Sequence, residues 1–332
     1  MPQHPPARRA ALRAGLGLGV ALAALPRTVF GQTYPSRPVR ILIGTPAGDS
    51  ADAIARQLAM RLAVLLGQPF FIENKPGAHG FIVAAAAKSA EHDGSTLLVS
   101  SGGQIAINPA LYGKKLPYDP LKDFEPIVPI MRGPLFLYVD AKLPIRDVKE
   151  WIAWVKARPG TVSYGSGGSG TTQHLSMEML KRAVGLEMTH VPYRGSPMVL
   201  QDVMGGQIPF AFDAAASILA QARAGRIRVI ALTGAQRSGI LPDVPTLAEQ
   251  GVAGIDARVW VGLFGLAGTP AAAIQRLNET ANRILKESEF VEFLRATGGE
   301  PGGGSADEFR RFIAADIARW TVVVRESGVQ PE

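Results

Sequence analysis

The chain reads Gly44-Thr45-Pro46-Ala47-Gly48-Asp49-Ser50-Ala51-Asp52 between an apolar run at residues 39–43 and a segment of helical spacing at residues 53–66. A strand that ends in a small-residue turn and leads directly into a helix leaves unpaired N–H groups at the helix start, and such groups bind anions. We therefore expect a ligand at residues 44–52, called here the first turn.

A second turn has the same order of strand, small residues and helix. It spans residues 164–172 and reads Tyr-Gly-Ser-Gly-Gly-Ser-Gly-Thr-Thr. If the two turns belong to two lobes and face each other across a crevice, their backbone N–H groups and hydroxyls suit a small anion or a carboxylate. The alternative is a pair of ordinary strand-to-helix turns without a ligand.

Composition limits the class of protein. With 332 residues, of which 47% are apolar and 19% charged, the chain is long enough for two globular domains. It has no cysteine, which excludes disulfides and thiolate chemistry, and His174 and His190 lack the spacing of metal ligands. Lysine and arginine are scattered along the chain, so we expect no nucleic-acid partner and no cofactor.

The N-terminus predicts an export signal over residues 1–31. Arg8, Arg9 and Arg13 precede an apolar segment at residues 14–25 that is too short to span a membrane, and a small residue follows at Gly31. The paired arginines favour the twin-arginine route over the general secretory one. Removal of the signal lowers the formal charge from +7 to +3, and we expect a soluble periplasmic protein.

The remaining chain alternates short β-rich runs with helical segments. This alternation predicts an α/β fold with parallel or mixed sheets and two lobes, whose crevice lies where the carboxyl ends of the strands converge. We expect an aperiodic surface loop at residues 117–129, a linker at residues 301–305, and C-terminal helices at residues 271–286 and 306–325.

Asp213 directly follows an apolar strand predicted at residues 208–212. It should therefore emerge at the carboxyl end of that strand and face the crevice, where it could contact a ligand. A turn-forming aspartate is the alternative.

The sequence gives less support to an esterase function or to a nucleotide-binding site than to a carboxylate site. Gly48-Asp49-Ser50 matches the opening tripeptide of GDS-type esterases, but the last histidine is His190, and no Gly-x-Ser-x-Gly elbow is present. Neither turn carries a nucleotide-binding motif. We therefore expect no enzyme, and a GDS-type hydrolase remains an alternative of a different class.

Several short motifs together are similar to one family. They are residues 73–77 (Glu-Asn-Lys-Pro-Gly), 108–109 (Asn-Pro), 116–120 (Leu-Pro-Tyr-Asp-Pro), 191–195 (Val-Pro-Tyr-Arg-Gly), 205–207 (Gly-Gly-Gln), 241–246 (Leu-Pro-Asp-Val-Pro-Thr) and 268–270 (Gly-Thr-Pro). With them, the chain from Tyr34 onward resembles the Bug family, the solute-binding receptors of tripartite tricarboxylate transporters.

The resemblance implies a two-lobed periplasmic-binding-protein fold of the flytrap type (type II), with hinge-linked lobes. Residues 32–133 and 259–332 would form lobe 1, and residues 134–258 would form lobe 2. It also implies a receptor that delivers a small organic solute, most simply a carboxylate, to membrane permease subunits. We expect a monomer, and a periplasmic ligand sensor of the same fold is the nearest alternative.

The resemblance also implies which residues hold the ligand. Both turns would grip a carboxylate through N–H groups, hydroxyls and water, and Asp213 would contact the far end of the ligand. The predicted ligand-binding set is Ala47, Gly48, Asp49, Ser50, Asp52, Ser166, Gly168, Thr171, Thr172 and Asp213.

The sequence departs from the family pattern at the first turn. Thr45 stands where the family usually has an aromatic residue, Asp49 replaces a glycine, and His79 replaces another glycine. A carboxylate at Asp49 would repel a carboxylate ligand by several kcal/mol at ~4 Å in a partly buried setting. Either Asp49 points to solvent, or the ligand is neutral or cationic.

Overall fold

The computed structural model describes residues 34–331, so the predicted export signal lies outside the described residues. We group the described elements into two lobes according to the hydrophobic cores that they share. The boundaries of these lobes along the chain stay a prediction. Within residues 34–331, no helix combines the length and the apolar character needed to cross a bilayer.

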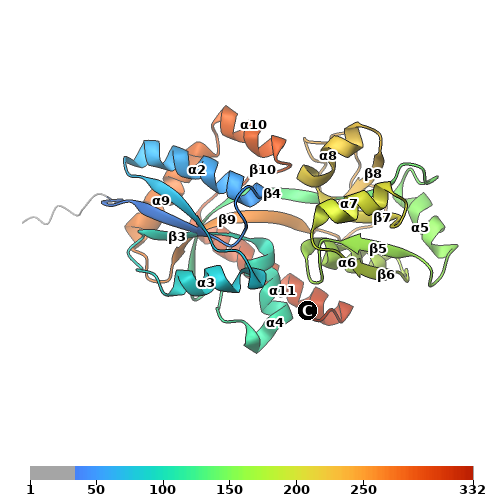
Figure 1. Ribbon diagram of the computed structural model, residues 1–332, viewed down its shortest axis with the longest axis horizontal. Coiled ribbons are helices and arrows are strands. Elements are labelled where there is room, and N and C mark those ends of the chain that lie inside the picture. The colour runs from blue at the N-terminus through green and yellow to red at the C-terminus, as the bar shows by residue number, and fades with distance from the viewer. Residues whose placement is uncertain (1–33, 332) are drawn as a thin grey trace, which may run out of the picture. The chain divides into compact units, whose positions relative to one another are not determined.

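Lobe 1 is built on a five-stranded region with helices on both faces (Figure 1). Its strands are β1 (Val39–Ile43), β2 (Phe70–Asn74), β3 (Thr96–Ser101), β9 (Arg258–Leu266) and the first part of β4 (Phe124–Asp140). Its helices are α2 (Ser50–Leu66), α3 (Phe81–Lys88), α4 (Asn108–Tyr112), α9 (Ala271–Ile284), α10 (Ser288–Ala296) and α11 (Ala306–Ser327). The short helical segments η1 (Ala78–Gly80), η2 (Gly103–Ile107) and η3 (Gly113–Lys115) connect these elements.

Lobe 2 repeats the α/β organisation. Its strands are β5 (Ser163–Ser166), β6 (Thr189–Pro192), β7 (Phe210–Ala214), β8 (Ile227–Leu232) and the second part of β4. Its helices are α5 (Val148–Lys156), α6 (Thr172–Ala183), α7 (Ser196–Met204) and α8 (Ala215–Arg223). Parallel pairs β1–β2, β1–β3, β5–β6 and β5–β7 are joined to antiparallel pairs around β4 and β9, so the sheet is mixed, as predicted.

Strand β4 joins the two lobes. Residues 124–134 of β4 pair with β9, and Leu135–Val139 pair with β7 of lobe 2. Figure 1 shows β4 and β9 running between the two groups of elements. The carboxyl ends of β1 and β5 each lead into a helix, α2 and α6, and these two junctions are the first and the second turn.

The predicted surface loop at residues 117–129 is wrong in its second half. From Phe124 the chain is already in β4, and Ile127 and Val128 are fully buried. Pro126 and Pro129 make the sequence atypical of a central strand, because proline removes a hydrogen-bond donor and is normally found at sheet edges or bulges. The β4–β9 register indeed shifts at both prolines, which accommodates them within a central strand.

The first residue of the predicted linker at residues 301–305, Pro301, belongs to a short strand. β10 (Glu300–Pro301) pairs with β4 at Arg132 and Met131. Gly302 then lies so close to the Pro129 carbonyl that a side chain there would overlap it. This segment is therefore packed against the junction between the lobes.

Candidate functional site

The first turn is organised by Asp52, which is almost completely buried. Its carboxylate accepts hydrogen bonds from the Gly48 N–H (2.9 Å), Arg56 Nε (2.9 Å) and Asn74 Nδ2 (2.8 Å). Burial opposes ionisation, but these three donors outweigh it and lower the pKa of Asp52 to about 2. Asp52 is therefore an ionised anchor that fixes Gly48, whose φ of +86° favours glycine.

Asp49 has a local partner in the structure. It is the N-cap of α2, and its side chain accepts a hydrogen bond from the Ala51 N–H at 2.9 Å. Its side chain is exposed to solvent. The capping geometry accounts for an aspartate at this position, because Asp is among the best N-cap residues.

The second turn is closed by side-chain bonds to its own backbone. Thr171 is the N-cap of α6: its hydroxyl accepts from the His174 N–H at 3.3 Å and donates to the Gly168 carbonyl at 2.8 Å. The buried Ser166 hydroxyl also lies 2.9 Å from that carbonyl. Gly168, with φ of +138°, is thereby held from two sides.

Two stacked histidines contact the second turn through hydrogen bonds. The rings of His174 and His190 lie 3.5 Å apart at an interplanar angle of 10°. His174 Nδ1 accepts from the Gly170 N–H at 3.0 Å, and His190 Nε2 lies 2.7 Å from the Ser166 hydroxyl. Burial, helped by the neighbouring His190 and Lys181, lowers the pKa of His174 to about 3, so this ring is neutral.

A small cavity, called here the crevice cavity, lies between the second turn and lobe 1. Its volume is about 210 Å³. Lobe 2 contributes Ser169, Gly170 and Thr171 to its wall, and lobe 1 contributes residues from the ends of β1 and β3, from η1 and η2, and from α4. The two lobes touch here, because a side chain on Gly170 would overlap Leu111 of α4.

Gln104 shapes the lobe 1 wall of the crevice cavity. Its Oε1 accepts a hydrogen bond from the Ser100 hydroxyl at 2.7 Å. Its Nε2 lies over Gly44 and Gly80, where added β-carbons would approach it to 2.7 Å and 2.5 Å. Two glycines from different turns are thus required so that this amide can reach the cavity.

Most of the predicted ligand-binding residues lie on one of the two turns, and only one of them lines the crevice cavity. Thr171 lines the crevice cavity, and Ser166, Gly168 and Thr172 belong to the same turn. Ala47, Gly48, Asp49 and Ser50 are exposed on the first turn, which meets the cavity at Gly44 rather than at these residues. Gln104, Asn108 and His79 line the cavity but are absent from the predicted set.

Asp213 lies at the carboxyl end of β7, as predicted, but it is only 2% exposed and does not line the crevice cavity. Its Oδ1 accepts from the Ala214 N–H at 2.8 Å and from Gln173 Nε2 at 3.3 Å. Burial raises the pKa of Asp213 despite these donors and the hydroxyls of Ser196 and Ser217. Asp213 therefore orients Gln173, the second residue of α6.

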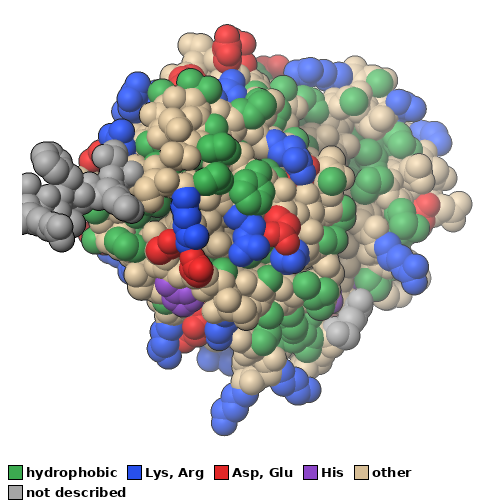
Figure 2. Space-filling view, turned by 60° about the vertical axis from the view of Figure 1, so that its left-hand side comes forward, with side chains coloured by type: hydrophobic (Ala, Val, Ile, Leu, Met, Phe, Trp, Pro, Cys, Tyr) green, Lys and Arg blue, Asp and Glu red, His purple; other side chains and the backbone are tan. Residues whose placement is uncertain are grey.

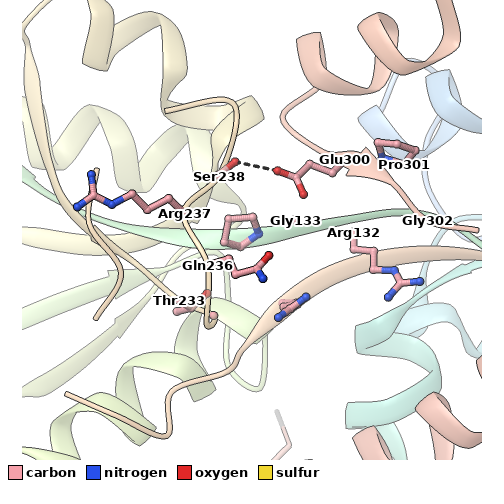
Figure 3. A pocket seen from close by; sticks show the side chains of 12 residues that line it. Arg132, Gly133, Thr233, Gln236, Arg237, Ser238, Glu300, Pro301 and Gly302 are labelled. Atoms are coloured by element: carbon pink, nitrogen blue, oxygen red, sulfur yellow. Dashed lines mark hydrogen bonds between the residues drawn. The ribbon is translucent and has the colours of Figure 1, made fainter. Parts of the chain in front are cut away.

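A separate cavity of about 320 Å³ lies at the junction of the lobes, where Arg132 and Pro134 of β4 meet the segment after β8 (Figure 3). Glu300 reaches across it from β10 and accepts hydrogen bonds from the Ser238 hydroxyl and the Gly239 N–H, both at 3.3 Å. This carboxylate of lobe 1 is therefore bonded to a loop of lobe 2.

The segment around Glu300 also packs directly on lobe 2. Residues 298–302, Gly-Gly-Glu-Pro-Gly, are called here the glycine strap. A β-carbon on Gly298 would overlap the backbone of Ala215 and Ala216, the first residues of α8. Since α8 begins two residues after Asp213, the strap contacts the helix that follows the strand of this aspartate.

Within residues 34–331, no group of three or more histidine and carboxylate side chains is placed to hold a metal ion. On the face drawn in Figure 2, lysine and arginine side chains are spread among acidic and apolar ones.

Comparison with known proteins places this geometry in a family. The model of the tripartite tricarboxylate transporter family receptor, TctC, matches residues 54–329. Protein BugT of Bordetella pertussis is 34% identical over 320 residues, which cover 96% of this chain and 98% of BugT.

Solved structures agree with the fold. The structure of R. palustris Rpa4515 with adipate is 35% identical, with a TM-score of 0.80 over 90% of this chain and 100% of that chain. MatC from Rhodopseudomonas palustris with bound malate is 29% identical, with a TM-score of 0.75 over 88% of this chain and 100% of that chain. These similarities confirm the predicted α/β periplasmic-binding-protein fold.

The family consists of receptors that bind solutes and carry out no reaction, so the hydrolase alternative is not supported. The chain belongs to the TctC family, also called the Bug family, of periplasmic solute-binding receptors of tripartite tricarboxylate transporters.

Proposed function

We propose that this receptor captures a small carboxylate in the crevice cavity. The observation that carries the proposal is a cavity of about 210 Å³ at the N-terminus of α6, walled by both lobes. This volume lies below the roughly 300–1,000 Å³ of pockets for drug-sized ligands, which suits a small metabolite. Two similar structures hold adipate and malate, both dicarboxylates.

The start of α6 supplies the main anion-binding groups. The hydroxyl of Thr171 caps the N–H of His174, so the N–H groups of Thr172 and Gln173 keep no acceptor within the helix. Oriented N–H groups at a helix N-terminus attract a carboxylate through hydrogen bonds and through the helix dipole. The Gln104 amide adds a donor from the opposite wall.

The first turn completes the site in this proposal. In this proposal the ligand extends past the cavity wall at Gly44 and contacts the exposed Ala47, Gly48 and Ser50, while Asp52 positions Gly48. Asp49 acts as a helix cap, so its charge does not exclude a carboxylate ligand.

We infer the partners and the location from the family and from the N-terminal sequence. The receptor is exported by the twin-arginine route, which the paired Arg8 and Arg9 favour, and works in the periplasm as a monomer. There it delivers its ligand to the membrane permease subunits of a tripartite transporter.

The site can be tested through a single N–H group. Thr172→Pro removes the proposed N–H donor, but proline is tolerated at the first position of a helix, and the extended Thr171 (φ −70°, ψ 161°) suits a residue before proline. Thr172→Ala removes the hydroxyl and keeps the N–H group. We expect Thr172→Pro to bind the carboxylate at least tenfold more weakly than Thr172→Ala in calorimetry.

The ligand for this test comes from a thermal-shift screen of mono-, di- and tricarboxylates. A ligand at 100 times its dissociation constant should stabilise the wild type by roughly 2.7 kcal/mol. Equal affinity of the two Thr172 variants would remove the α6 N-terminus from the site. Stabilisation by no carboxylate would contradict the proposed ligand class.

A further inference from the structure

The segment η1 carries unusual backbone strain beside the crevice cavity. Ala78 and His79 both have positive φ angles, +45° and +52°, between Gly77 and Gly80, which are also positive. Residues with a β-carbon are uncommon in this region, and each such residue costs of order 1–3 kcal/mol. A strained turn of this kind persists only where the surrounding structure holds it.

Lobe 1 holds His79 through a chain of hydrogen bonds made by the buried residues Asn108 and Tyr118. Asn108 Nδ2 donates to the His79 carbonyl at 2.9 Å and also lies 3.1 Å from the Tyr118 hydroxyl. The Tyr118 hydroxyl in turn donates to the Gln104 carbonyl at 2.5 Å. The backbone of His79 is thereby tied to the same segment that places the Gln104 amide in the cavity wall.

His79 lines the crevice cavity on the lobe 1 side, and the residue is exposed. Its ring lies 5.8 Å from the ring of Tyr112, measured between centroids, and it remains accessible to solvent. The other described residues of the lining are glycine, serine, threonine, asparagine, glutamine, leucine, tyrosine and proline. Among the described lining residues, His79 alone has a side chain that can carry positive charge.

This position lies across the cavity from the second turn. A ligand carboxylate held at the N-terminus of α6 directs the other end of a short ligand towards lobe 1. A group at that end meets neutral donors and one imidazole. Discrimination between a charged and a neutral end group must therefore come chiefly from the imidazole, because charge-assisted hydrogen bonds are roughly twice as strong as neutral ones.

We propose that His79 is a specificity-determining residue, which binds the second carboxylate of the ligand and makes the receptor selective for dicarboxylates over monocarboxylates of the same shape. This inference rests on the proposed function, since it assumes that the first carboxylate binds at the second turn. It adds a named residue and a ligand class to that site.

The test compares each diacid with its monoamide, which has the same shape but one charge fewer. Calorimetry at pH 6 with succinate, succinamate, adipate and adipamate gives the ratio of affinities for wild type and variants. We expect a ratio of at least tenfold in favour of the better-bound diacid for the wild type. In His79→Gly this ratio should fall to about threefold or less.

Ala78→Gly is the matched control. It relieves the same kind of backbone strain one residue earlier, but Ala78 does not line the cavity and the imidazole is kept. We expect Ala78→Gly to keep the wild-type ratio within twofold, while both variants raise the melting temperature because strain is removed.

Three results would overturn the inference. If His79→Gly keeps the wild-type ratio, the imidazole does not select the ligand. If both glycine variants lose the ratio equally, backbone rigidity rather than the side chain is responsible. If the wild type binds diacid and monoamide equally well, His79 gives no charge selectivity although carboxylate binding stands, whereas binding of none of the four compounds would overturn the proposed function itself.

Discussion

At the scale of single residues, His174 links the second turn to pH. Its Nδ1 accepts the Gly170 N–H, so the ring must stay neutral, and its pKa is lowered from 6.5 to about 3 by burial and by His190 and Lys181. Above pH 6.5 the contribution of this ring is fully present. As the pH falls from 6.5 towards 3, the unfolded chain gains a proton that the folded chain does not, and stability is lost.

His174→Gln should remove this dependence. For the wild type, each pH unit below 6.5 should lower the free energy of unfolding by up to about 1.4 kcal/mol through this group. Urea unfolding at several pH values between 4 and 7 measures the slope. Equal slopes for the wild type and His174→Gln would refute this role.

Asp49 can be tested by separating its cap from its charge. Asp49→Ala removes the oxygen that accepts from the Ala51 N–H and should lower the free energy of unfolding by about 1 kcal/mol, whereas Asp49→Asn keeps a capping oxygen and should cost little. Denaturant unfolding measures both. Neither variant should change dicarboxylate affinity, and a clear gain in affinity for Asp49→Asn would show that the charge faces the ligand after all.

Sequence reasoning located the turns better than the cavity wall. Local patterns identified both strand-to-helix turns, because a small-residue turn before a helical period is a property of neighbouring residues. Gln104, Asn108 and His79 could not be found in this way, since Gly44, Gly80 and Gln104 meet only when β1, η1 and η2 pack together. The one sequence feature that pointed to this wall is that His79 replaces a glycine of the family pattern, but this replacement alone predicts no contact with a ligand.

At the scale of elements, most strands and helices followed from the spacing of apolar residues, and the exceptions have physical causes. The first part of β4 was missed because its prolines lie at bulges. Helices α4, α8 and α10 were not predicted, and their N-cap residues Ile107, Ala214 and Glu287 make no side-chain capping bond that a sequence pattern could reveal. β10 consists of two residues, Glu300 and Pro301, too few for any periodicity.

The glycine strap yields a prediction at this scale. Gly298→Ala adds a methyl group that overlaps the start of α8, so it should separate the lobes and weaken ligand binding at least tenfold, about 1.4 kcal/mol. Gly254→Ala is the matched control, because Gly254 has nearly the same φ (+85° against +83°) but nothing within 4 Å of the added β-carbon.

Both variants place alanine at a positive φ, so both lose some stability for the same backbone reason. Only the Gly298 variant disturbs the contact between the lobes. Calorimetric titration with the best carboxylate separates the two effects. Equal affinities of the two variants would show that the strap does not influence the ligand site.

At the scale of the whole molecule, two α/β lobes joined by β4 and β9 place two helix-initiating turns near one crevice. Among residues 34–331, polar contacts also cross between the lobes from Ser238 to Glu300 and from Arg182 to the Glu326 carbonyl (3.3 Å). A ligand that binds both walls of the crevice stabilises this arrangement, because it adds contacts that separated lobes would lack.

The central claim is that this receptor recognises a carboxylate in the crevice cavity. The most direct measurement is calorimetric titration of the mature protein with succinate, malate and adipate, and with the corresponding diamides, which have the same shape but no charge. We predict that at least one diacid binds with one molecule per chain and at least tenfold more tightly than its diamide. Absence of binding by all three diacids, or equal affinity for diacid and diamide, would contradict the claim.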